Sequence, residues 1–348
     1  MSQSPLITVL MPCYNAMPFL KEALDSIVNQ TYTNLEILCI NDGSTDATRE
    51  VLDDCASKDS RIRVIHNEEN IKLIRTLNKG IDLASGEYIA RMDADDISEL
   101  NRIEIQLNFL LKNPNIDIVS SAFRRISEQG EVIGEVIIRQ TLKLSCHFSS
   151  FFYVPFHHGP MMSKAAVLKS NHFLDESYAL HTEDYELFSR LVSNGVKVNN
   201  IRERLYRVRI NSQSVSRKYT LIQDKNFVEC ARRHNLAFNP TPMSFDVQEV
   251  LVNRIDKSKL CVSLLKESIS HYKLFKKHFI SQYPDASENE LKEIDSIYNT
   301  HLFDILVQSF KQGDIKVRFF ILTRFSMLLR ILFSKNSIGY IKTKRVKN

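Results

Sequence analysis

Short runs of apolar residues alternate with helix-like patterns through the N-terminal part of the chain. Four runs have the length and composition of buried strands, and apolar side chains repeat at helical spacing between them. These runs are residues 6–11, 36–40, 61–65 and 87–91. Strands that alternate with helices predict an α/β fold, with a doubly wound, mostly parallel sheet flanked by helices.

A different pattern fills the C-terminal part of the chain. Residues 116–138 predict two or three further strands, but beyond residue 216 apolar residues repeat at helical spacing with Lys and Glu between them. We therefore expect two domains, an α/β domain over residues 1–216 and a helical C-terminal appendage over residues 217–348. The chain has 9 glycines in 348 residues, well below the usual fraction of roughly 7%, which argues against a turn-rich all-β fold.

Positive charge is concentrated at the C-terminal end. The net charge is +5, yet residues 311–348 contain ten Lys or Arg and a single Asp, so the remainder of the chain is slightly acidic. A basic character spread over the whole chain, as in nucleic-acid-binding proteins, is therefore absent. An anionic membrane surface is the candidate partner of the basic tail.

Cysteine usage and the apolar stretches bear on the compartment. The six cysteines are scattered without a C-x-x-C pair or a zinc-like Cys/His cluster, which fits a reducing compartment. No basic residue precedes Lys21 and Pro12 interrupts the first apolar run, so we expect no secretory signal. Residues 144–163 and 317–334 contain prolines or arginines that disfavour a membrane span. We therefore expect a cytoplasmic protein.

Acidic residues follow the fourth predicted strand at its carboxyl end. Asp93 and Asp95 are separated by one residue, a spacing that lets two carboxylates bind one divalent cation. Such a short pair can equally cap the next helix. Asp42, at the end of another strand, and Arg91, beside the acids, favour the functional interpretation, because ligands of doubly wound sheets bind at the carboxyl ends of the strands.

Another acidic pair, Glu183 and Asp184, opens a later predicted helix. Asp184 shares a helix face with apolar residues, while Glu186 and Arg190 are expected to pair on the solvent side. A helix N-terminus favours an ionised carboxylate, so Asp184 is a candidate proton acceptor. The alternative is that the pair only caps the helix.

Five segments carry a resemblance to a known family. Residues 7–15 read ITVLMPCYN, and QTY at residues 30–32 precedes EILCINDGSTD at residues 36–46. ASGEYIARMDADD follows at residues 84–96 and TEDYEL at residues 182–187. In this order the segments resemble the motifs of glycosyltransferase family 2, whose members have the GT-A fold. The resemblance covers roughly residues 5–216.

The resemblance implies which residues bind the nucleotide. Pro12 and Tyr14 match the first-strand motif, whose aromatic ring lies against the base, and Asn15 stands beside them in the same motif. Asp42 matches the acid that hydrogen-bonds the uracil, and Arg75 lies in the stretch that lines the nucleotide pocket.

The resemblance also implies a metal and a catalytic base. Asp93 and Asp95 match the D-x-D motif, which contacts the ribose and, mainly through the second acid, Mn²⁺ or Mg²⁺ on the diphosphate. Asp184 matches the catalytic base, with Glu183 beside it. The implied mechanism is inverting, because the base takes the proton from the acceptor hydroxyl as it attacks in line, while the cation neutralises the leaving diphosphate.

A few positions depart from the family pattern. Arg209 stands where relatives often carry a His near the metal, so it either contacts the diphosphate or is a plain surface residue. Lys72 stands where many relatives have Gly. The uncharged aromatic segment of residues 148–162 is expected to be an acceptor-side loop. Within it we interpret His157 as a packed loop residue, and we place His158 near the donor or acceptor.

The sequence thus predicts an inverting, metal-dependent glycosyltransferase, a hexosyl- or N-acetylhexosaminyl-transferase. The donor would be a nucleotide sugar, a UDP-sugar by family habit, and the acceptor a saccharide or lipid-linked saccharide of a bacterial surface polysaccharide such as lipopolysaccharide or capsule. One alternative is a sugar-nucleotide nucleotidyltransferase, but residues 12–16 lack its Gly-rich basic loop. The other alternative is a nucleotide-binding scaffold that has lost its catalytic activity. The presence of both Asp95 and Asp184 argues against it.

The apolar tail segment allows two interpretations. Residues 319–333 surround arginines that project in different directions, so a helix there is not cleanly amphipathic. One hypothesis places it on the inner face of the cytoplasmic membrane, with the basic cluster of residues 342–347 at anionic lipid. The other is a buried terminal helix followed by a solvated basic tail.

Overall fold

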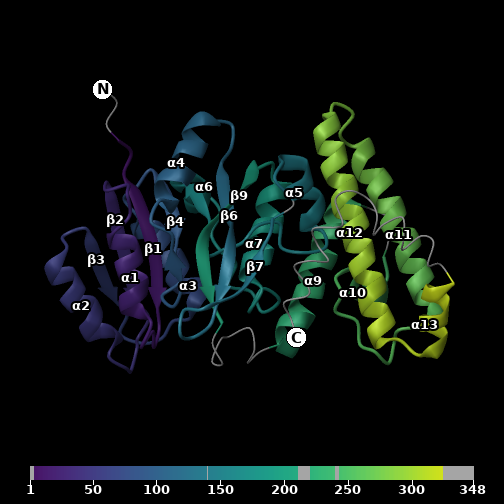
Figure 1. The fold of residues 1–348 in the computed structure, drawn as a ribbon, viewed down its shortest axis with the longest axis horizontal. Helices are drawn as coiled ribbons and strands as arrows, with labels where there is room; N and C mark the ends of the chain where they lie inside the picture. The colour runs from purple at the N-terminus through teal and green to yellow at the C-terminus, as the bar shows by residue number, and fades with distance from the viewer. Residues whose placement is uncertain (1–3, 139, 211–219, 240–242, 324–348) are drawn as a thin grey trace. The chain divides into compact units, whose positions relative to one another are not determined.

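The computed structural model describes residues 4–138, 140–210, 220–239 and 243–323, which form two compact units (Figure 1). The first unit comprises Met1–Thr141, Phe156–Glu176 and Asn194–Ser214, and the second comprises Leu142–Pro155, Ser177–Ser193 and Val215–Asn348. Two internal segments therefore group with the C-terminal helices. The functional division at residue 216 stays a prediction.

One mixed sheet forms the centre of the first unit. Its strand order is β3-β2-β1-β4-β8-β6-β9-β5, and β7 pairs with β6 off this path. The strands are β1 Ile7–Cys13, β2 Leu35–Asn41, β3 Ile62–His66, β4 Tyr88–Arg91, β5 Ile97–Ser98, β6 Ile118–Ile126, β7 Val132–Val136, β8 Met162–Lys164 and β9 Val198–Arg209. Strands β1 to β4 are parallel, whereas β5, β7 and β8 run antiparallel to their neighbours. The predicted α/β fold is confirmed, with the antiparallel pairs lying beyond β4.

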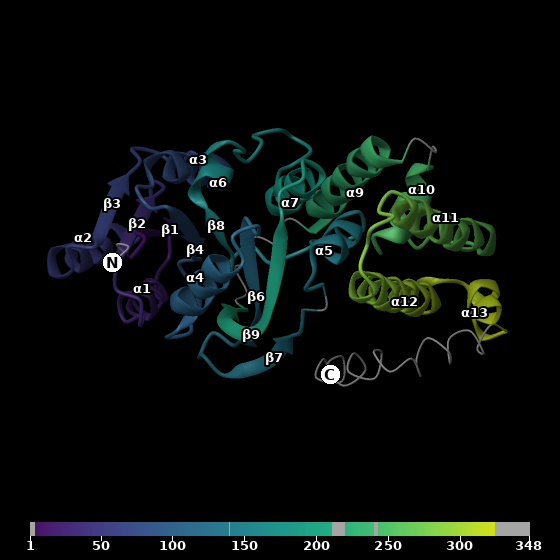
Figure 2. The same cartoon turned by 90° about the horizontal axis from the view of Figure 1, so that it is seen from above.

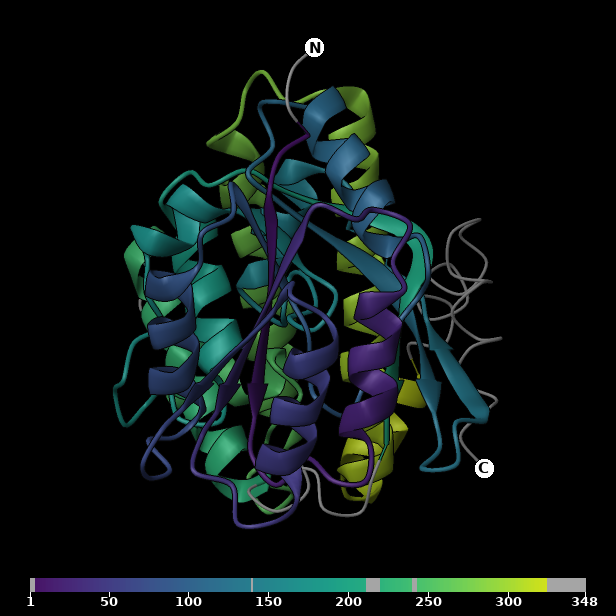
Figure 3. The same ribbon diagram turned by 90° about the vertical axis from the view of Figure 1, so that its left-hand side faces the viewer.

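Helices cover both faces of this sheet (Figures 2 and 3). They are α1 Leu20–Val28, α2 Thr48–Lys58 and α4 Arg102–Lys112 on one face, and α3 Leu73–Leu83 and α6 Ala165–Lys169 on the other. Side chains of β1 alternate between the faces, so that Val9 packs in the core with α1 while Leu10 meets α3. A Cβ added to Gly80 of α3 would lie 2.2 Å from Leu10 Cδ1. Glycine is required there because the helix approaches the strand closely.

The second unit is helical. Its helices are α5 Lys143–Ser150, α7 Glu183–Ser193, α9 Thr220–Phe238, α10 Phe245–Leu251, α11 Val262–Ser281, α12 Glu288–Gln312 and α13 Ile315–Leu322. The predicted helical pattern is confirmed, with a break at Asn253, whose φ is 58°. Phe148 and Phe152 are fully buried against the α11 side chains Tyr272 and Phe275. The first half of the segment expected to be an acceptor-side loop is therefore part of a packed aromatic core.

Glu186 of α7 corrects a sequence-based expectation. The predicted pair with Arg190 exists, with 2.8 Å between Arg190 Nε and Glu186 Oε1. Glu186 is nevertheless buried rather than on the solvent side. The reason is that α7 packs against both α5 and α9, so more than one of its faces is covered.

The tail is described only up to residue 323. Residues 324–348, which contain most of the proposed membrane segment and the basic cluster, lie outside the described residues. Among the helices that the structure describes, none is both long enough and apolar enough to cross a membrane.

Buried histidines are expected to make the stability of the second unit depend on pH. Burial lowers the pKa of His147 to about 4 and that of His234 to about 3, with smaller contributions from Lys143 and from His147, respectively. Unfolding restores values near 6.5, so the unfolded chain binds more protons between these limits. We expect the contribution of these two histidines to the free energy of unfolding to be constant above about pH 6.5 and to fall by about 1.4 kcal/mol per pH unit and histidine as the pH drops toward 4.

Urea unfolding at pH 7 and pH 5 measures this loss. The variant His234→Asn should flatten the pH dependence, whereas the control His271→Gln, on the more accessible part of α11, should keep it. An equal change in unfolding free energy between the two pH values in the wild type and in His234→Asn would contradict the expectation.

Candidate active site

The loops that follow β1 and β2 are joined by hydrogen bonds. The backbone amide of Asn15 donates to Ser44 Oγ at 3.0 Å, and Asn15 Oδ1 accepts from the backbone amide of Thr45 at 2.8 Å. Asn15 has a φ of 47°, a conformation that Asn tolerates better than most residues. Next to it, Tyr14 is 51% exposed. Its ring is therefore accessible for stacking against a base.

Asp42 organises the loop that follows β3. It is buried, and its carboxylate accepts hydrogen bonds from Asn67 Nδ2 at 2.8 Å and from the backbone amides of Ile71 and Lys72 at 2.9 and 3.0 Å. Lys72 has a φ of 76°, in the region that favours glycine. The predicted contact of Asp42 with uracil stays a prediction beside this structural role.

The D-x-D residues follow β4, which lies next to β1 in the sheet. Arg91 is buried, and its Nη2 lies 2.6 Å from Asp93 Oδ1. The backbone amide of Asp93 donates to the hydroxyl oxygen of Tyr206 at 3.0 Å. Because β2, β1 and β4 are adjacent and parallel, the structure brings the loops of Asp42, Asn15 and Asp93 to one edge of the sheet.

The loop after β4 contains three acidic residues, Asp93, Asp95 and Asp96. Burial and the charge of Asp93 raise the pKa of Asp95 to about 6. Burial and the charges of Asp93 and Asp95 raise the pKa of Asp96 well above its ordinary value. Such carboxylates are stabilised in their charged form by a bound cation.

The residues present fit a divalent cation of oxygen preference. Asp93 and Asp95 supply carboxylate oxygens, the ligands that Mg²⁺ and Mn²⁺ prefer. No cluster of three or more metal-ligating His, Cys, Asp or Glu side chains occurs among the residues that the structure describes. This donor set suits an ion that completes its coordination with substrate phosphate and water, as Mg²⁺ commonly does.

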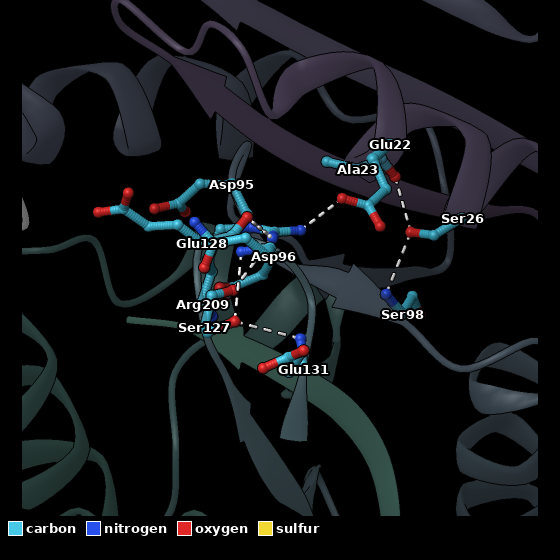
Figure 4. Close-up of polar contacts among 11 residues, drawn as sticks. Glu22, Ala23, Ser26, Asp95, Asp96, Ser98, Ser127, Glu128, Glu131 and Arg209 are labelled. Atoms are coloured by element: carbon cyan, nitrogen blue, oxygen red, sulfur yellow. Dashed lines mark hydrogen bonds and ion pairs between the residues drawn. The ribbon is translucent and has the colours of Figure 1, made fainter. Parts of the chain in front are cut away.

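Arg209 is not a surface residue. Its side chain is 1% exposed, and its Nε donates to the backbone oxygen of Asp95 at 2.9 Å (Figure 4). This burial rules out the surface alternative considered from the sequence, since the guanidinium is enclosed by protein acceptors. A contact between Arg209 and the diphosphate stays a prediction.

The other predicted contact residues of the first unit are placed as follows. Arg75 is exposed on α3 and pairs with Asp175, with 2.6 Å between Nε and Oδ2. His157 packs edge-on against Phe123 with ring centroids 4.6 Å apart, in keeping with its interpretation as a packed loop residue. His158 lies against Phe173, and burial lowers its pKa well below the ordinary value. A role of Arg75 or His158 toward a substrate stays a prediction.

Asp184 and Glu183 belong to the second unit. Both are partly buried at the start of α7, and the backbone amide of Tyr185 donates to Asp184 Oδ1 at 2.7 Å. Their N-terminal position on the helix, which the sequence predicted, favours the ionised form. Their place opposite Asp95 stays a prediction.

Two buried residues beneath the D-x-D loop escaped the sequence analysis. Arg102 is fully buried, and its Nη2 donates to the backbone oxygens of Arg91, Gly159 and Met161. Tyr206 is also fully buried. The only signal for Arg102 is a cation at the start of an amphipathic helix, which ordinarily indicates a solvated residue.

Comparison with known proteins identifies the family. The model of the family described as glycosyl transferase family 2 matches residues 8–163. A Haemophilus influenzae protein named as an uncharacterized glycosyltransferase is 32% identical over 281 residues, which cover 77% of this chain and 86% of the relative. This similarity extends well beyond the short motifs.

Solved structures show the same fold at low sequence identity. S. aureus TarS 1–349 in complex with UDP-GlcNAc has a TM-score of 0.55 at 14% identity, covering 97% of this chain and 91% of that one. The mannosyltransferase PcManGT from Pyrobaculum calidifontis, in complex with GDP-Man and Mn²⁺, has a TM-score of 0.54 at 15% identity, covering 99% and 85%. Together with the family match, they confirm the GT-A fold, and the chain belongs to glycosyltransferase family 2.

Proposed function

We propose that the protein is an inverting, metal-dependent glycosyltransferase that takes its sugar from a nucleoside diphosphate. The observation that carries this proposal is the acidic loop at the carboxyl end of β4. There, Asp93 and Asp95 lie close enough for the charge of one to raise the pKa of the other, at the sheet edge that Asn15 and Asp42 share. Ligands of doubly wound sheets bind at this edge, and a cation there would neutralise the charge of a nucleoside diphosphate.

Asp95, with Asp93, would hold Mn²⁺ or Mg²⁺ on the diphosphate. When bound, the cation supplies Lewis-acid stabilisation of the charge that develops on the leaving group. Support comes from the donor set and from PcManGT, whose structure contains Mn²⁺. Arg91 holds Asp93 from the buried side, so one carboxylate oxygen has a fixed position before the donor binds.

Asp184 would accept the proton of the acceptor hydroxyl as that oxygen attacks the anomeric carbon. Its position at the start of α7 favours the charged carboxylate that this step requires. Glu183 would lie beside it. Displacement of the diphosphate in a single in-line step inverts the anomeric configuration.

The donor is proposed to be a UDP-sugar, since TarS binds UDP-GlcNAc. PcManGT binds GDP-Man, so the same fold accepts a different nucleotide. The acceptor is proposed to be a saccharide or lipid-linked saccharide of a bacterial surface polysaccharide.

A panel of nucleotide sugars tests the donor and the metal together. With a UDP-sugar and Mn²⁺ we expect the protein to release UDP. EDTA should lower the rate of release by at least about 10²-fold, and added Mn²⁺ should restore it. GDP-mannose is the matched alternative donor. Full turnover in EDTA would contradict the metal role, and release only from GDP-mannose would contradict the UDP assignment alone.

A membrane surface is the proposed partner of the C-terminal region. In α13, Ile315, Phe319 and Leu322 are 81%, 68% and 53% exposed, and their spacing of four and three residues places them on one face. Lys316 and Arg318 lie on the same helix. An apolar stripe with neighbouring cations is typical of helices that lie in an anionic bilayer surface.

Co-sedimentation with vesicles tests this surface. We expect the full chain to bind vesicles that contain anionic lipid. Changing Ile315, Phe319 and Leu322 to Ser should weaken this binding by at least about tenfold, because burial of each apolar side chain contributes about 1.5–3 kcal/mol. Leu274→Ser, at an exposed position of α11, is the control. Equal binding by the triple variant would remove α13 from the proposal.

A further inference from the structure

Arg209, the last residue of β9, sits in a nearly closed cage of acceptors. The residue is 4% exposed, and its guanidinium donates to oxygens from three separate parts of the first unit. The acceptors are the backbone oxygens of Asp95 at 2.9 Å, Ser127 at 3.2 Å and Glu128 at 2.8 Å, and the Glu22 carboxylate. Figure 4 shows these groups surrounding the side chain.

The backbone and the flat face of Arg209 add two further contacts. Its backbone amide donates to Asp96 Oδ1 at 2.7 Å. Its guanidinium carbon lies 4.5 Å from the centroid of the Phe19 ring, directly before α1. One residue therefore connects the D-x-D loop, the turn between β6 and β7, and the beginning of α1.

Two of these contacts hold the D-x-D loop directly. Nε holds the carbonyl of Asp95, and the backbone amide holds the carboxylate of the next residue, Asp96. The backbone carbonyl of Asp95 and the side chain of the residue that follows it are thus both held, which limits how far the backbone that carries the Asp95 carboxylate can turn. Two of the remaining acceptors are neutral carbonyls, so most of this geometry comes from hydrogen-bond direction, for which the planar guanidinium is suited and a Lys ammonium is not.

The connection to α1 joins the two halves of the nucleotide site. Helix α1 follows the β1 loop of Tyr14 and Asn15, and Glu22 lies in its first turn. Farther along α1, Ser26 Oγ accepts from the backbone amide of Ser98 at 3.1 Å, in β5 directly after the acidic loop. Of Arg209 and Ser98, which both connect α1 to this region, Arg209 is the one that hydrogen-bonds Asp95 and Asp96 directly.

We infer that Arg209 is a positioning residue, which holds the Asp95 carboxylate in the orientation that receives the cation by fastening the D-x-D loop to α1 and to the β6–β7 turn. The inference rests on the proposed function, because it takes Asp95 to be the metal ligand. This role differs from the two considered from the sequence, which were a direct contact with the diphosphate and a plain surface position. Here Arg209 acts through the D-x-D loop, from a buried position.

The effect on metal binding should be large, because groups that orient a metal ligand typically contribute 10–100-fold to metal affinity. We expect Arg209→Ala to weaken Mn²⁺ binding in the presence of UDP by about that factor. Arg209→Lys should recover only a small part, because an ammonium cannot reproduce the fork of donors. Glu22→Gln, which changes a half-exposed partner and should leave the fold intact, is expected to weaken binding by about threefold or more.

Bound Mn²⁺ is counted by the loss of the free-ion electron paramagnetic resonance signal, a readout independent of turnover, and thermal melts report folding. Arg204→Ala is the matched control, since Arg204 lies on the same strand and pairs with Glu135 at 2.8 Å, away from the D-x-D loop. Arg204→Ala should bind Mn²⁺ like the wild type, whereas a purely structural role of Arg209 would lower the melting temperature without changing the affinity of the folded protein.

The outcomes separate this inference from the proposed function. If the wild type binds Mn²⁺ with UDP and folded Arg209→Ala binds it equally well, the inference is refuted and the proposed function stands. If Arg209→Ala does not fold, Glu22→Gln decides in the same way, and wild-type affinity in that variant refutes the inference. A wild type that binds no Mn²⁺ with UDP refutes the metal site and the inference with it.

Discussion

Replacement of Asp184 by Asn is expected to lower kcat by about 10²–10⁴, the contribution typical of a positioned general base. The amide has nearly the same shape as the carboxylate but cannot accept the acceptor proton. The KM for the nucleotide sugar should change little, because the base acts on the acceptor. Turnover of a UDP-sugar with a saccharide acceptor, measured with the melting temperature, checks the prediction.

The control for this variant is Asp256→Asn, an exposed carboxylate in the same compact unit that accepts from Ser258. It should leave kcat unchanged. Hydrolysis of the donor by water needs no saccharide acceptor. If Asp184→Asn still hydrolyses the donor but no longer transfers the sugar, the defect lies in activation of the acceptor hydroxyl. Undiminished transfer in Asp184→Asn would show that another residue is the base.

Replacement of Asp95 by Asn is expected to lower turnover by about 10²–10³, the cost of losing one preorganised electrostatic stabiliser. The neutral amide is a poorer ligand for a hard cation. Unlike Asp184→Asn, this variant should also weaken Mn²⁺ binding measured with UDP alone. Isothermal titration of UDP with and without Mn²⁺ distinguishes the two variants.

Asp25→Asn is the control for Asp95→Asn, since Asp25 is an exposed carboxylate of α1 that pairs with Lys21 in the preceding turn. It should bind Mn²⁺ and UDP like the wild type. Raising the Mn²⁺ concentration should recover part of the activity of Asp95→Asn. Unchanged Mn²⁺ affinity in Asp95→Asn would assign the metal to other residues.

Local patterns were sufficient for much of the first unit. Strands β1 to β4 agree with their predicted ranges within a few residues, because a buried strand is a short apolar run that differs from the helical spacing on either side of it. The positions of Asp42 and Asp93 at strand ends follow from the same patterns. Parallel strands alternating with helices then bring these acids to one edge of the sheet.

Strands that pair with distant segments were not predicted. Strand β9 pairs with β6 and β5, and β8 pairs with β4 and β6, across long sequence separations. Strands with distant partners carry little local signal, because their stability comes from the neighbouring strand. The position of Tyr206 below the backbone of Asp93 depended on this pairing and could not be foreseen.

Burial of charge was also beyond the sequence. Glu186 was assigned to the solvent side, and Arg209 was left between a diphosphate contact and a surface position, yet both are buried. A charged residue can be buried when several acceptors converge on it, and those of Arg209 come from α1, the D-x-D loop and the β6–β7 turn. One-dimensional periodicity contains no information about such convergence.

The sequence by itself therefore determined the α/β fold, the family and the acidic residues at the strand ends, because each depends on short-range periodicity or on motifs that are contiguous in the chain. Only the tertiary structure decided what supports those acids. Arg102, Tyr206 and Arg209 lie beneath or beside the D-x-D loop because strands and helices far apart in the sequence pack together there. The physical reason is that hydrogen bonds to a buried cation or hydroxyl require groups from several elements to meet at about 3 Å, a condition that only the folded chain meets.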